Sequence, residues 1–185
     1  MPRPVFESLR LRAVALAFAG VVAACTTVPP VAPAGPSDVL SGRLALRVEP
    51  LASEAPRSVS AAFDLRGDSR AGTLGLSTPL GSMLAEARWR PGSVVLVTPQ
   101  GTRRFADLDD LTREVLGESV PVEAWFDWLH GRPWPGAAST SQAAGGSFSQ
   151  LGWSVDLSRL AAGAVVASRQ QPLPAVAVRI QLDGS

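Results

Sequence analysis

Residues 42–48 read GRLALRV, a stretch in which apolar side chains alternate with charged or small ones. Leu44, Leu46 and Val48 fall on one face of such a chain, because successive side chains of a β-strand point to opposite faces. Residues 59–66, VSAAFDLR, repeat the alternation and are followed by a cluster of turn residues. The pattern predicts half-buried strands joined by short turns, and short turns connect antiparallel neighbours.

Short apolar runs bounded by glycine, proline or polar residues continue this pattern along the chain. They predict further strands at 74–76, 83–89, 94–97, around 148, 153–157, 164–169 and 175–182. Between them, residues 107–116 change to helical spacing, with Asp107 a candidate N-cap and Gly117 a stop. A second amphipathic helix is expected from Pro121 to His130. Residues 137–146 lack any periodicity, which predicts a mobile loop.

The N-terminus has the pattern of a lipoprotein signal peptide, residues 1–24. Three arginines precede an apolar run at 13–24 that is too short to span a bilayer, because a spanning helix needs roughly 18 or more apolar residues. The last three residues of this run and the next residue, Val22-Ala23-Ala24-Cys25, match the lipobox pattern. This match predicts a diacylglycerol on the sulfur of Cys25. The alternative for Cys25 is an ordinary buried thiol or a disulfide with another chain.

Residues 25–37 are expected to tether the lipid to the folded part of the protein. Four prolines among Ala, Val, Gly and Thr favour extended polyproline geometry, which at ~3.1 Å per residue reaches up to roughly 40 Å. Residues 38–185 are then expected to form a single domain, because the remaining chain is long enough for one sizeable hydrophobic core.

Composition and motifs argue against several classes of function. Removing the signal peptide leaves 14 basic and 15 acidic side chains, so no basic surface for nucleic acid is expected. A hydrolase needs a nucleophile beside a base, whereas His130 is the sole histidine and is expected at a helix end. Asp107, Asp109 and Asp110 complement the dipole of a helix N-terminus without any catalytic role. We therefore expect neither an enzyme nor a metal or other cofactor.

What remains is the apolar inner face of the sheet. Candidate residues for an apolar cavity are Leu44, Leu46, Phe63, Leu74, Leu76, Met83, Val95, Trp125 and Trp153. They are mixed with Ala61, Ala85 and Ala87, whose small side chains leave room for a ligand on a concave sheet. The alternative is that the amphipathic helices fill this space, which is the commoner arrangement and the one that the pattern alone favours.

Four stretches together resemble the LolB family of outer-membrane lipoprotein receptors. They are Gly42-Arg43-Leu44, STPLGS at 77–82, GTRRFAD at 101–107 and WLHGRP at 128–133. The resemblance covers most of residues 38–185. It implies a mostly β (α+β) fold, an incomplete antiparallel β-barrel whose short helices cover an apolar cavity that shelters acyl chains.

The resemblance also implies a function and its partners. Proteins of the family accept acylated lipoproteins from the soluble periplasmic carrier LolA and insert them into the outer membrane. Leu80, between Pro79 and Gly81, falls at the position of the family's protruding-loop leucine, so this turn is the expected membrane-insertion loop. From the residues alone, Leu80 is equally a turn residue packed on the core. We expect a monomer, anchored by Cys25 in the outer membrane and facing the periplasm.

Two further expectations complete this interpretation. The family usually ends with a further strand pair, whereas this sequence stops soon after the strand expected at 175–182, so a more open barrel is expected at that edge. The competing function is a non-transporting envelope lipoprotein, a scaffold or assembly accessory. It predicts an interior too small for lipid and no effect of substitutions at Leu80.

Overall fold

The computed structural model describes residues 38–49, 55–142 and 146–184. All of them fall within the second of the two units into which the chain divides, Ala34–Ser185. The expected signal peptide, the expected lipidation site Cys25 and the expected tether at 25–37 lie outside the described residues. Within the described ranges, no helix is long and apolar enough to cross a membrane.

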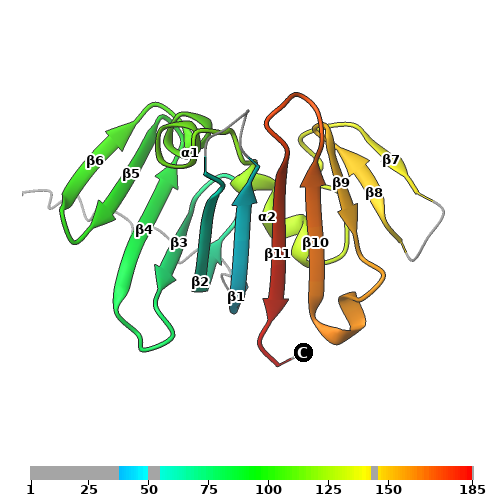
Figure 1. The fold of residues 1–185 in the computed structure, drawn as a ribbon, viewed down its shortest axis with the longest axis horizontal. Coiled ribbons are helices and arrows are strands. Elements are labelled where there is room, and N and C mark those ends of the chain that lie inside the picture. The colour runs from blue at the N-terminus through cyan, green and yellow to red at the C-terminus, as the bar shows by residue number, and fades with distance from the viewer. Residues whose placement is uncertain (1–37, 50–54, 143–145, 185) are drawn as a thin grey trace, which may run out of the picture. The chain divides into compact units, whose positions relative to one another are not determined.

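The described residues form eleven strands, two α-helices and one short 3-10 helix (Figure 1). The strands are β1 (Asp38–Val48), β2 (Arg57–Gly67), β3 (Gly72–Ser77), β4 (Met83–Arg90), β5 (Ser93–Thr98), β6 (Gly101–Phe105), β7 (Ser139–Ser141), β8 (Phe148–Gln150), β9 (Trp153–Asp156), β10 (Ala164–Arg169) and β11 (Val176–Leu182). The helices are α1 (Leu108–Leu116), α2 (Val122–Leu129) and the 3-10 helix η1 (Leu160–Ala162).

All strands belong to one antiparallel sheet with the order β6-β5-β4-β3-β2-β1-β11-β10-β9-β8-β7. β6 and β7 are its two edges and do not pair with each other, so the sheet is open. This confirms the expected fold, a mostly β protein built as an incomplete antiparallel barrel. The opening is not at the C-terminal strand, however, because β11 pairs with both β1 and β10. The expectation of an open edge there was wrong.

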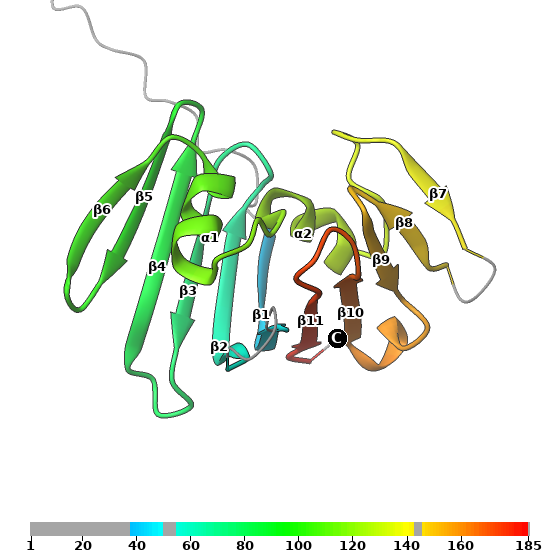
Figure 2. The ribbon, with the colours of Figure 1, turned by 45° about the horizontal axis from the view of Figure 1, so that its top comes forward.

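Both helices follow from local sequence signals. The carboxylate of Asp107 accepts a hydrogen bond from the backbone N–H of Asp110 at 2.8 Å, which caps the first turn of α1. Gly117 ends the helix with φ +82°, a left-handed conformation that side chains with a Cβ rarely adopt. Figure 2 shows α1 and α2 lying within the curve of the sheet. A helix pair therefore occupies the interior that the sheet leaves open.

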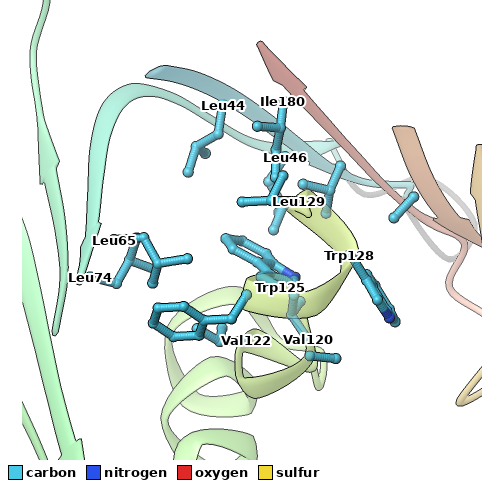
Figure 3. Packing of buried hydrophobic residues seen from close by; sticks show 14 of the residues in the cluster. Leu44, Leu46, Leu65, Leu74, Val120, Val122, Trp125, Trp128, Leu129 and Ile180 are labelled. Carbon is cyan, nitrogen blue, oxygen red and sulfur yellow. The ribbon is translucent and has the colours of Figure 1, made fainter. Parts of the chain in front are cut away.

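The core lies between the inner face of the sheet and α2. Seven of the eight residues of α2 are buried, because its apolar side chains have the sheet on more than one side. Trp125 and Trp128 extend to different sides of α2, with Leu44 and Leu46 of β1 on the Trp125 side (Figure 3). The Trp128 ring lies 6.3 Å from those of Phe148 and Trp153, between centroids. Burial of each large apolar side chain in this core stabilises the fold by roughly 1.5–3 kcal/mol.

One strand was not predicted, and two local expectations need correction. The stretch 101–105 forms β6. Its side chains are mostly exposed because it is an edge strand, so its sequence lacks the apolar alternation that predicts a strand. Part of the segment expected to be a mobile loop, Ser139–Ser141, is strand β7 and pairs with β8. Pro121 is the N-cap of α2 rather than its first residue.

Candidate functional site

An apolar cavity of about 250 Å³ lies between the first half of the sheet, α1 and the start of α2. Its walls come from β1 to β5, the two helices and the segment that links them. They are Leu44, Leu46, Val59, Leu74, Leu76, Leu84, Ala85, Ala87, Leu96, Leu108, Leu111, Thr112, Val115, Leu116, Val120, Val122 and Trp125. The helices therefore fill part of the interior and leave part of it empty.

Thr112 contributes the one polar side chain of this lining, and its hydroxyl is already used. The Thr112 hydroxyl donates to the carbonyl oxygen of Asp109 at 3.2 Å and accepts from the backbone N–H of Val120 at 3.1 Å. A buried polar group that has its partners makes little demand on a ligand. The cavity thus offers dispersion contacts and exclusion of water, the two interactions that an alkyl chain needs.

The mouth of the cavity is marked by lining residues that also reach solvent. Val115 of α1 is 48% exposed and Leu84 of β4 is 39% exposed. Such large apolar side chains at a surface mark a site of contact with apolar partners when they adjoin an apolar pocket. Val59 and Leu76 are half-buried between this mouth and the deeper walls.

The turn between β3 and β4 joins the strands that carry the lining residues Leu76 and Leu84, and it presents Leu80 to solvent, 95% exposed. The N–H of Gly81 donates to the carbonyl of Thr78 at 2.9 Å, and the N–H of Ser82 donates to the Thr78 hydroxyl at 3.1 Å. Gly81 has φ +86°, which suits glycine. These hydrogen bonds fix the conformation of the turn. Leu80 lies on this ordered turn, exposed to solvent, and does not pack on the core.

The structure places the nine expected cavity residues in different surroundings. Five of them line the cavity: Leu44, Leu46, Leu74, Leu76 and Trp125. The other four, Phe63, Met83, Val95 and Trp153, lie outside its lining.

Met83 and Val95 are displaced because strand alternation is not regular across β4 and β5. A bulge shifts the register of β3 and β4, so that Leu76 pairs with Ala85 but Ser77 pairs with Met83. The intervening Leu84 takes the inner position that alternation assigned to Met83. Val95 pairs with Arg88 and Arg104 on the outer face, whereas its neighbours Val94 and Leu96 are buried.

Phe63 and Trp153 face inward but belong to other parts of the core. Phe63 is 2% exposed and pairs with Gly42 and Leu76. Trp153 packs against Trp128 on the far side of α2 from the cavity. Sequence reasoning had no means of seeing that α2 divides the interior into two halves.

Leu84 and Val115 were missed as cavity residues. Two consecutive apolar residues at Met83 and Leu84 interrupt the alternation of β4, which is the sequence signal of a bulge. Val115 falls at helical spacing with Leu108 and Leu111, which predicts a helix but not a cavity wall. The sequence shows that both residues are apolar, but it does not show that they lie at the mouth of a cavity.

Both helices are held by buried contacts. In α1 the Thr112 hydroxyl accepts from the buried N–H of Val120, and Leu108 and Leu111 are buried. α2 is fixed by a buried hydrogen bond, and the segment before it by the buried Arg169, whose Nη2 lies 2.5 Å from Oε2 of Glu118. α1 is held at its exposed side by Arg103, which donates to Glu114 at 2.8 Å, and Arg57. Exposed ion pairs contribute little to stability. The exposed contacts of α1 therefore add little to the buried ones that hold it.

The side chains considered for catalysis make contacts that stabilise helix ends and turns. His130 is the C-cap of α2, and its Nδ1 lies 2.5 Å from the carbonyl oxygen of Phe126. Asp110 forms an ion pair with Arg113 at 3.0 Å, and Asp109 accepts a hydrogen bond from the Ser119 hydroxyl at 2.6 Å. None of these side chains lines the apolar cavity.

An open antiparallel sheet around a helix pair, with a partly empty apolar interior and an exposed leucine on the β3–β4 turn, defines the class of protein: an incomplete β-barrel with an apolar cavity. The profile of the family described as outer membrane lipoprotein LolB matches residues 39–183. The outer-membrane lipoprotein LolB of Bordetella bronchiseptica is 37% identical over 97% of this chain and 94% of its own. That of Bordetella pertussis is 38% identical over 86% and 85%, and that of Dechloromonas aromatica 32% over 80% and 81%. The chain belongs to the LolB family and is an outer-membrane lipoprotein.

Proposed function

We propose that this protein, as a monomer anchored through acylated Cys25, accepts acylated lipoproteins from the periplasmic carrier LolA and inserts them into the outer membrane. The observation that carries the proposal is the empty apolar cavity of about 250 Å³ with the 95% exposed Leu80 on the β3–β4 turn. A cavity without unsatisfied polar groups is suited to an alkyl chain, and an exposed leucine on a fixed turn is suited to a bilayer.

The energetics of acyl chains explain why such a cavity is needed. Each methylene exposed to water costs about 0.8 kcal/mol, so a lipoprotein with several long chains needs a protein to cover them in the periplasm. Each transfer then has a favourable free energy if the receptor binds the chains more tightly than the carrier does, and if the bilayer binds them more tightly than the receptor does. No nucleotide hydrolysis is required at this step.

The volume of the cavity sets a condition on how cargo enters. An engineered apolar cavity of about 150 Å³ holds one benzene molecule, so about 250 Å³ holds only part of a long chain. A full cargo requires one wall to move. α1 carries Val115 at the mouth and Leu108 and Leu111 on the cavity wall, so its outward displacement would enlarge the space.

Insertion follows from the position of Leu80. Entry of one leucine side chain into hydrocarbon contributes roughly 1.5–3 kcal/mol, enough to bias docking on the bilayer and weak enough to be reversed. Because the turn adjoins the mouth through Leu76 and Leu84, chains that leave the cavity meet the lipid where Leu80 enters it.

The test is transfer of an acylated lipoprotein from its loaded periplasmic carrier to the purified unit of residues 34–185, followed by mass spectrometry of the complex. Capture of the acylated cargo but not of a non-acylated version is expected. Failure to capture either form, with a folded sample and the cognate carrier, would favour a scaffold or assembly role for the same lipoprotein.

A further inference from the structure

A second pocket lies on the outer face of the sheet, close to the Leu80 turn. It has a volume of about 230 Å³ and is lined by Gly42, Arg43, Ser60, Ala61, Ala62, Pro79 and Asp183, here called the Arg43 pocket. Arg43 and Ala62 are register partners of β1 and β2. A water molecule takes about 30 Å³ of liquid volume, so the pocket has room for a small polar group.

The Arg43 pocket contains one group of each charge, and neither has a charged partner among the described residues. Arg43 and Asp183 are exposed, and their side chains make no ion pair or hydrogen bond with residues of the described ranges. Arg47 on the same strand is different, because its Nε donates to Glu49 at 2.6 Å. The Asp183 backbone is fixed by its N–H, which donates to the carbonyl of Ser41 at 2.9 Å.

The position of the pocket relates it to the membrane. Pro79 forms part of its wall, and the next residue is Leu80, the most exposed of the large apolar side chains that the structure describes. If Leu80 enters the hydrocarbon, as the proposed function requires, Pro79 and the pocket behind it lie in the headgroup layer. The inference therefore rests on the proposed function.

We propose that the Arg43 pocket binds the phosphoethanolamine headgroup of a membrane phospholipid. The Arg43 guanidinium offers a planar fork of N–H donors that matches a phosphate. The Asp183 carboxylate accepts hydrogen bonds from a primary ammonium, whereas the quaternary ammonium of phosphatidylcholine has no N–H to donate. A group with two negative charges, such as free phosphate, is repelled by Asp183, so a lipid zwitterion suits the pocket better.

Headgroup binding gives the receptor a defined orientation on the bilayer. Leu80 alone anchors a point, about which the protein is free to tilt. A second contact at Arg43, on a neighbouring strand, restricts that tilt, and so keeps the nearby cavity mouth at the lipid surface. Capture of cargo in solution does not need this contact.

The test uses residues 25–185 with Cys25→Ala, which contain the whole unit Ala34–Ser185 but no acyl anchor. Its partition is measured by co-sedimentation with phosphatidylcholine vesicles that contain or lack phosphatidylethanolamine. The protein should bind the phosphatidylethanolamine vesicles about fivefold more tightly, as one exposed ion pair with hydrogen bonds allows. Arg43→Gln should abolish this preference.

Arg179→Gln is the matched control. Arg179 is an exposed residue of β11 that pairs with Ala45 and lies outside the pocket, and it makes no ion pair within the described ranges. The substitution Arg179→Gln removes one positive charge from the sheet, as Arg43→Gln does. If both substitutions weaken binding to the two kinds of vesicle equally, general attraction to lipid phosphates explains the result and the pocket proposal is wrong.

Asp183→Asn tests the ammonium half of the site. It should remove the preference for phosphatidylethanolamine and increase binding to phosphatidylglycerol vesicles, because Arg43 then acts without an opposing charge. Soluble phosphoethanolamine should compete for the parent protein better than inorganic phosphate. Equal competition by the two would show a simple anion site and overturn the proposal.

Failure of the proposed function gives a different result. If Leu80→Glu binds vesicles as well as the parent does, insertion of the turn is wrong, and the pocket loses its place in the headgroup layer. If cargo capture fails while the Arg43-dependent preference persists, the receptor function is wrong and the pocket is supported.

Discussion

The indole N–H of Trp128 donates a hydrogen bond of 2.8 Å to Oε1 of Gln150, and this bond joins α2 to β8 inside the core. The same Oε1 accepts from the backbone N–H of Trp134 at 2.9 Å. The Gln150 amide nitrogen donates to the carbonyls of Trp134 and Ala137, each at 2.7 Å. One side-chain amide, 2% exposed, thus uses all four of its bonding positions to connect a helix, a strand and a loop.

Gln150→Leu should lower the free energy of unfolding by about 3 kcal/mol, because several buried polar groups lose their partner together. Urea unfolding measures this loss. Gln181→Leu is the control, since that exposed residue donates one bond, to Ala162, and its removal should cost no more than about 1 kcal/mol. Equal losses in the two variants would show that the Gln150 network does not hold the core.

Leu80→Glu should leave thermal unfolding nearly unchanged, because the side chain is 95% exposed. Cargo should still be accepted from the carrier, while its delivery to vesicles should fall at least about tenfold, since a charge on the turn opposes entry into hydrocarbon. Leu173→Glu is the matched control, a 60% exposed leucine on another turn that should not affect delivery. A loss of cooperative unfolding in Leu80→Glu would instead mean that Leu80 supports the core.

Ala85→Phe should fill the mouth end of the acyl-chain cavity. Ala85 lines the cavity opposite Leu76, so a phenyl ring there occupies the space that an acyl chain would enter. Capture of acylated cargo should fall about tenfold or more, while the melting temperature stays constant or rises, because filling a void restores contacts. Ala45→Phe, on the outer face of β1, is the control. Undiminished capture by Ala85→Phe would place the acyl chains elsewhere.

Burial raises the pKa of Glu123 above its ordinary value of 4.5, and the negative charges of Asp109 and Asp107 raise it further, against a backbone hydrogen bond that lowers it. The folded state therefore binds the proton more tightly than the unfolded state. This favourable contribution is complete below pH 4.5 and is lost as the pH rises through the higher pKa of the folded state.

Glu123→Gln should consequently raise the melting temperature at neutral pH by about 1 °C, a small effect because solvent screens the partly exposed group. The gain should vanish below pH 4.5, where Glu123 is already protonated. Glu114→Gln, which removes the exposed pair with Arg103, should give no such gain. A gain that is independent of pH would assign the effect to packing and not to charge.

Cys25→Ala should release the protein from the membrane fraction of the cell, because one leucine at the turn cannot replace covalently attached acyl chains. Fractionation with detection of the mature protein measures this. The folded part should keep its ability to capture acylated cargo. A Cys25→Ala protein that remains tightly bound to the membrane would contradict lipidation at this residue.

Local patterns predicted most of the architecture because they report interactions between near neighbours. The alternation of Leu44, Leu46 and Val48 is read directly as the buried face of β1, and Asp107 with Gly117 marks both ends of α1. β6 and β7 escaped prediction because edge strands keep exposed, polar side chains. Met83 was misplaced because a bulge depends on the partner strand as well as on its own residues.

The sequence by itself determined the antiparallel β class, the two helices with both ends of α1, and the presence of a turn at residues 78–81, since each depends on contacts within a few residues. The exposure of Leu80 on that turn came from the structure. Only the tertiary structure decided that the space between sheet and helices stays partly empty. That outcome depends on how Trp125 and Trp128 of one short helix divide the interior. It also brought Arg43, Pro79 and Asp183 together, because pairing of β1 with both β2 and β11 joins segments that are far apart in the chain.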